Sequence, residues 1–102
     1  MKVITVCGSM KFIKEMIEIA ETLEMQGNCM LMPLYNPFKT RKDDYTQEEA
    51  IILDEMHKER IKLAHAILVL DVDHYIGEST KKEIKFIKKL NKEIIYYSHL
   101  IQ

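Results

Sequence analysis

The feature that most constrains the fold is a regular alternation between short apolar runs and longer segments with helical periodicity. The apolar runs predict strands at residues 3–7, 28–32, 66–71 and 93–97. Apolar residues at three- and four-residue steps predict helices at residues 11–26, 46–64 and 80–90. Strands that alternate with helices are joined by right-handed crossovers, so we expect a parallel sheet with helices on both faces.

The simplest arrangement is a flavodoxin-like or Rossmann-like three-layer α/β sandwich with strand order 2-1-3-4, built from four strands with a fifth left open. The 102 residues fit one domain over residues 1–102. In this order the chain reverses direction between the first and third strands, and open α/β sheets bind ligands outside the carboxyl ends of strands at such a point. We therefore expect the ligand site where Gly8 and Ser9 meet Gly77 and Ser79.

Composition limits the partners and the cellular location. The chain is 47% hydrophobic and 30% charged, as in water-soluble globular domains, and its formal net charge is −1. No global field attracts nucleic acid or an anionic membrane, so neither is expected as a partner. Cys7 and Cys29 form no C-x-x-C pair, and the opening apolar run stops at Gly8, well short of a signal or membrane span. We expect a cytoplasmic protein with reduced thiols.

The third predicted helix carries a carboxylate on its apolar face. One face holds lysines, namely Lys81, Lys82, Lys85, Lys88, Lys89 and Lys92. Glu83 falls instead with Ile87 and Leu90, so its side chain is aimed toward the sheet. A poorly hydrated carboxylate beside a ligand site can act as nucleophile or general base. The alternative is a capping box in which Thr80 begins the helix and Glu83 only bonds the N-cap amide. The sequence leaves both open.

The second predicted helix also carries polar residues on its apolar face, His57 and Arg60. An inward histidine is usually a hydrogen-bonded structural group and an arginine can reach the sheet edge, but together they point weakly to an anionic or sugar ligand. Asp71 and Asp73 lie at the end of the third strand, where carboxylates can orient sugar hydroxyls or a base. The other histidines have no metal-site spacing, so neither a metal nor another cofactor is expected.

Two segments resemble one enzyme superfamily. Residues 6–10, Val-Cys-Gly-Ser-Met, resemble the first turn of the deoxynucleoside monophosphate N-glycosidases. Residues 77–84, Gly-Glu-Ser-Thr-Lys-Lys-Glu-Ile, are similar to the glycine-rich turn and helix start of the nucleoside 2-deoxyribosyltransferases. The order and spacing of elements agree over nearly the whole chain.

This resemblance implies that Glu83 is a nucleophile that attacks the anomeric carbon of a sugar, as in retaining glycosidases. It further implies that the turns containing Gly8, Ser9, Met10, Gly77 and Ser79 hold sugar or phosphate. It also implies homodimers or larger homo-oligomers, in which a neighbouring subunit helps to close the site.

Two positions depart from the superfamily pattern. His57 stands where characterised enzymes have an aspartate that contacts the sugar, and Gly77 lies near the place of a carboxylate or serine. The preferred expectation is transfer or hydrolysis of the N-glycosidic bond of a nucleoside or nucleotide. The alternatives are a non-catalytic module that binds a nucleotide-like ligand and a scaffold whose lysine-rich helix docks an acidic protein.

Overall fold

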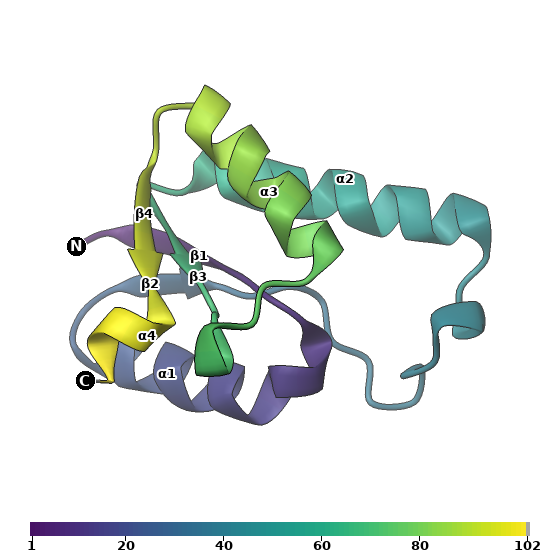
Figure 1. The fold of residues 1–102 in the computed structure, drawn as a ribbon, viewed down its shortest axis with the longest axis horizontal. Coiled ribbons are helices and arrows are strands. Elements are labelled where there is room, and N and C mark those ends of the chain that lie inside the picture. Colours follow the sequence, from purple (N-terminus) through teal and green to yellow (C-terminus); the bar gives the residue numbers. More distant parts are fainter. Residues whose placement is uncertain (102) are drawn as a thin grey trace.

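Four parallel strands form a sheet in the order β2-β1-β3-β4, which confirms the predicted order 2-1-3-4 and leaves no place for a fifth strand among the described residues (Figure 1). The strands are β1 (Val3–Cys7), β2 (Cys29–Leu31), β3 (Ala66–Val69) and β4 (Glu93–Tyr96). The computed structural model describes residues 1–101, without the side chain of Lys42. Within this part of the chain, no helix is both long enough and apolar enough to cross a lipid bilayer.

Helices cover both faces of the sheet, as the alternation predicts (Figure 1). The helices are α1 (Ile13–Met25), α2 (Gln47–Leu63), α3 (Glu78–Lys89) and the short α4 (Tyr97–Leu100). Helices α1 and α4 pack on one face, around Ile4, Val6 and Leu68. Helices α2 and α3 pack on the other, around Cys7, Ile67 and Val69. The two cores follow from the two-residue period of a strand, which sends successive side chains of β1 to opposite faces.

The start of α2 follows from the sequence. The Thr46 hydroxyl accepts a hydrogen bond from the Glu49 amide, and the Glu49 carboxylate accepts one from the Thr46 amide. These reciprocal hydrogen bonds form a capping box, which fixes the start of the helix predicted over residues 46–64. The hydrogen bond from the Thr46 backbone lowers the pKa of Glu49. Beyond this start, the first half of α2 extends past the edge of the sheet and leaves Ile51, Ile52 and Met56 about half exposed (Figure 1).

Lys92 does not belong to the lysine face of α3, so the prediction that it does is wrong. The helix ends at Lys89, and Asn91 adopts the left-handed conformation (φ 56°) expected of a residue just past a helix C-terminus. The chain turns there, and Lys92 reaches across to α2. Its Nζ donates hydrogen bonds to the carbonyl oxygens of Lys62 (2.9 Å) and Ala64 (2.6 Å). A cation therefore caps the C-terminus of α2, where the helix dipole is negative.

We expect the Lys92→Met variant to lose about 1 kcal/mol of unfolding free energy, because the methionine keeps the apolar stem but leaves the last carbonyls of α2 without a charged donor. Lys89→Met is the matched control, since Lys89 is exposed near the end of α3. Urea denaturation of both variants measures the difference. Equal midpoints would show that the cap contributes nothing.

Candidate active site

Three side chains from three elements meet near the carboxyl end of β1. They are Cys7 of β1, His57 of α2 and Glu83 of α3. His57 Nε2 lies 3.3 Å from Cys7 Sγ and 2.9 Å from Glu83 Oε2. The thiol is fully buried, whereas the side chains of His57 and Glu83 keep 12% and 16% of their surface. One atom of each residue, namely Cys7 Sγ, a His57 ring nitrogen and a Glu83 carboxylate oxygen, lies within 4.8 Å of the other two, and these are atom types that bind metals in proteins.

Helical and strand periodicity bring these groups together. Cys7 is the last residue of β1 and packs toward α2 and α3. His57 lies one turn before the buried Ile61 of α2, and Glu83 lies one turn before the buried Ile87 of α3. Each polar side chain therefore shares a face with a residue anchored in the core, which directs it toward the sheet.

Glu83 does not cap its own helix, so the capping-box alternative is wrong. Helix α3 begins at Glu78 with Gly77 as its N-cap, and this cap makes no side-chain hydrogen bond. Thr80 lies inside the first turn and is buried. Because the helix starts earlier than expected, Glu83 lies in its second turn. Its carboxylate reaches His57 of the neighbouring helix.

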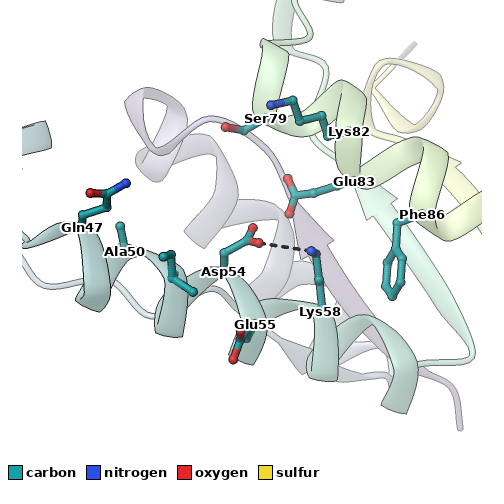
Figure 2. A pocket seen from close by; sticks show the side chains of 10 residues that line it. Gln47, Ala50, Asp54, Glu55, Lys58, Ser79, Lys82, Glu83 and Phe86 are labelled. Carbon is teal, nitrogen blue, oxygen red and sulfur yellow. Dashed lines mark ion pairs between the residues drawn. The ribbon is translucent and has the colours of Figure 1, made fainter.

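A cavity of about 590 Å³ lies between α2 and α3, and the Glu83 carboxylate points into the gap between the two helices (Figure 2). Its walls are Gln47, Ala50, Ile51, Asp54, Glu55, Lys58, Ser79, Lys82, Glu83 and Phe86. Asp54 and Lys58 form an ion pair of 3.3 Å on the α2 wall. The cavity thus combines charged groups of both signs, one hydroxyl and apolar surface, which suits a small polar ligand with a ring.

The cysteine is not placed as a nucleophile. In a nucleophile–histidine–acid triad the acid holds one ring nitrogen and the nucleophile contacts the other. Here Cys7 and Glu83 both approach Nε2, while the buried Nδ1 has no hydrogen-bond partner among the described residues. Burial, followed by the charge of Glu83 and a hydrogen bond to it, raises the pKa of Cys7 well above its ordinary value of 9.0. The thiolate required for attack is therefore disfavoured.

We expect iodoacetamide to alkylate Cys29 at pH 8 and to leave Cys7 unmodified in the folded protein. Cys29 is exposed, whereas Cys7 is buried. Because the pKa of Cys7 is raised, its thiol keeps the proton at pH 8, and only the thiolate reacts with iodoacetamide. Mass spectrometry should find one adduct under native conditions and two in denaturant. Rapid native modification of Cys7 in Cys29→Ser would contradict this.

The other predicted site residues are only partly assembled at this cavity. Ser79 lines it, and Gly77 begins the same helix, but Gly8, Ser9 and Met10 are not among its walls. The Ser9 hydroxyl instead accepts a hydrogen bond from the Lys11 amide at 3.4 Å, as the cap of a short 3-10 helix.

Tyr75 connects the two glycine turns. Its ring lies 3.6 Å below Lys11 Nζ and 6.0 Å from the ring of Phe12, both in the first turn region. At the second turn, a Cβ added at Gly77 would lie 3.4 Å from the Tyr75 hydroxyl. One aromatic side chain therefore contacts residues beside both turns.

The two aspartates after β3 have different surroundings, and neither lines the cavity. The buried Asp71 accepts hydrogen bonds from the Ser98 amide (2.8 Å) and hydroxyl (2.7 Å) at the start of α4. Its carboxylate therefore fastens the C-terminal segment to the sheet. Asp73 is exposed, in a turn where it and His74 both have positive φ.

The sequence analysis did not identify Cys7 or Lys82 as site residues. The two-residue period of β1 was a usable signal for Cys7, because it places the thiol on the face that α2 and α3 cover. Nothing in the sequence distinguishes Lys82 from the other lysines of α3.

No protein-family model matches the chain, and neither does any curated protein.

Proposed function

We propose that this chain transfers or hydrolyses the N-glycosidic bond of a nucleoside or nucleotide, with Glu83 as the nucleophile. The observation that carries the proposal is the placement of a mostly buried carboxylate, held 2.9 Å from His57, on the wall of a cavity. The resemblance of residues 6–10 and 77–84 to the deoxyribosyltransferase superfamily supports the same assignment.

The proposed reaction has two steps. A Glu83 oxygen attacks the anomeric carbon and forms a glycosyl ester, while the bond from that carbon to the base breaks and the base leaves with a proton from solvent. Water, or a ring nitrogen of a second base, then attacks the same carbon and gives its proton to solvent, while the ester bond from that carbon to the Glu83 oxygen breaks and the carboxylate is released. Two displacements at one carbon retain its configuration.

His57 positions the nucleophile in this scheme. An ionised carboxylate can only accept, so Nε2 carries the hydrogen that lies between it and Glu83. That contact fixes the orientation of the carboxylate on the wall of the cavity. On the same wall of the cavity as Glu83, the Ser79 hydroxyl and the Lys82 ammonium are the groups of α3 able to bind sugar hydroxyls or a 5′-phosphate.

The competing function is a module that binds a nucleotide-like ligand without cleaving it. The observation that favours it is the His57–Glu83 contact itself, because a carboxylate already engaged by an imidazole is less free to attack a sugar.

One experiment separates these functions. The purified chain is incubated with a panel of deoxynucleosides and their 5′-monophosphates, and release of free base is followed by chromatography. We expect release from at least one compound. A rise in melting temperature without release would establish the binding module instead, and the absence of both effects would overturn both functions.

We also propose that the protein acts in the cytoplasm as a homodimer whose second subunit covers the exposed side of α2. Ile51, Ile52 and Met56 lie about half exposed beside the open cavity, and both thiols are free. Sedimentation should give twice the chain mass, and Ile52→Lys should give monomers, since a charge is costly to bury in an apolar interface. Leu63→Lys, at the other end of α2, is the control and should stay dimeric. A monomeric wild-type chain at micromolar concentration would contradict the dimer.

A further inference from the structure

We propose that Cys7, His57 and Glu83 form a zinc site, with Sγ, Nε2 and Oε2 as protein ligands and a fourth position open to the cavity between α2 and α3. The proposed glycosidic reaction uses no metal, so this site goes beyond it. The inference depends only on the arrangement of the three side chains.

The first argument is the convergence of these atoms. Nε2 offers a single site, either a hydrogen or a lone pair, yet both Sγ (3.3 Å) and Oε2 (2.9 Å) approach it. A hydrogen on Nε2 can be donated to only one of these two atoms, and the thiol hydrogen is already shared with the Glu83 carboxylate. A cation at the centre of the cluster would be bound by all three atoms at once.

The second argument is distance. Tetrahedral zinc with ordinary bond lengths separates a sulfur from a nitrogen ligand by about 3.5 Å, and a nitrogen from an oxygen ligand by about 3.3 Å. The observed separations of 3.3 Å and 2.9 Å are only a few tenths of an ångström shorter. Small side-chain rotations of His57 and Glu83, which come from different helices, are enough to open this space.

The third argument is ligand chemistry and charge. Thiolate, imidazole and carboxylate are the ligands that Zn²⁺ and Co²⁺ prefer, whereas Mg²⁺ and Ca²⁺ require mostly oxygen. On coordination the Cys7 proton leaves to solvent. One thiolate and one carboxylate then balance the two positive charges of the ion, so no net charge is left in a largely buried place.

The fourth argument is the open side. Glu83 lines the cavity together with Ser79 and Lys82, so a ligand can reach an ion bound at this carboxylate. Three protein ligands with a water in the fourth position are the arrangement of exchangeable zinc sites, in contrast to closed structural ones. An ion held there engages Glu83 and thereby prevents it from attacking a sugar.

The test is a titration of the full chain with Co²⁺, under a reducing agent that does not bind metals and without any nucleoside. We expect a thiolate-to-cobalt charge-transfer absorption that saturates at one equivalent and disappears when Zn²⁺ is added. Cys29→Ser is the matched control and should keep the band, while Cys7→Ser should lose it. Glu83→Gln and His57→Gln should weaken cobalt binding by at least about tenfold.

Two outcomes would overturn the zinc site. One is a wild-type protein without a charge-transfer band, and the other is a band lost in Cys29→Ser but kept in Cys7→Ser. Circular dichroism checks that each variant is folded. If Cys7→Ser does not fold, the test uses Glu83→Gln and His57→Gln, and unchanged cobalt affinity in both would overturn the zinc site. The cobalt readout needs no substrate, so a failure of base release leaves the zinc result unaffected. A failure to bind cobalt likewise leaves the base-release result unaffected.

Discussion

Glu83→Gln abolishes the proposed base release: we expect kcat/KM to fall by about 10³-fold or more, as when an enzyme loses its nucleophile. The amide keeps the size of the side chain and can still contact His57, but it has no oxygen able to form a glycosyl ester. The measurement is base release from the best compound of the nucleoside panel, under single-turnover conditions. Because the change keeps the shape of the side chain, the melting temperature should shift by no more than a few degrees.

The matched control is Glu78→Gln, which removes the same charge from the first turn of α3. The Glu78 side chain is 86% exposed and pairs with Lys81, in an ion pair of little energetic value. We expect its activity to stay within about twofold of the wild type, since it lies outside the cavity wall. Release that survives Glu83→Gln would eliminate the nucleophile assignment.

Gly8→Ala should have the largest effect on stability, with a loss of about 1–3 kcal/mol of unfolding free energy. A Cβ at this position would lie 2.7 Å from Leu70 Cβ, a distance that neither atom can relieve by changing rotamer. The backbone has little freedom to move, because the Leu70 amide donates to the Cys7 carbonyl at 2.8 Å and Leu70 is buried. Thermal melts should show a drop of roughly 4–8 °C for each kcal/mol lost.

Gly77→Ala is the control for Gly8→Ala. It tests whether the loss of stability comes from crowding against Leu70 or from replacing any glycine by alanine. Its Cβ would first meet the Tyr75 hydroxyl at 3.4 Å, the end of a half-exposed side chain that can move aside. We expect it to change stability by less than about 1 kcal/mol. Equal losses in the two variants would show that crowding against Leu70 is not the cause.

The fold could be predicted because its signals are local. The β-branched run of β1, the Thr46 capping box and the left-handed Asn91 each fix one element from a few neighbouring residues. Alternation of strands and helices then leaves few topologies. The start of α3 could not be predicted, because Thr80 and Glu83 fit the capping-box pattern while the helix begins at Glu78 with Gly77 as its N-cap. The role of Glu83 therefore stayed open.

The site could be predicted only in part. The inward direction of Glu83 and His57 follows from helical periodicity, but their mutual contact depends on how α2 crosses α3. The partnership of Cys7 with both is likewise tertiary, since the three residues are far apart in the sequence. For the same reason, the position of the cavity between α2 and α3 could not be predicted from the sequence. The contact of Asp71 with Ser98 also joins segments that are distant in the sequence, so no local sequence pattern predicts it.

The way α2 is held gives the cavity one fixed end and one adjustable end. Near its C-terminus the helix is anchored by the buried Ile61 and by the Lys92 cap, whereas the N-terminal end of α2, which begins at Gln47, extends beyond the sheet. With a rise of about 1.5 Å per residue, a tilt of about 5° around Ile61 moves Gln47 by roughly 2 Å but His57 by only about 0.5 Å. The rim can therefore adjust to ligands of different size while the groups around Glu83 keep their spacing.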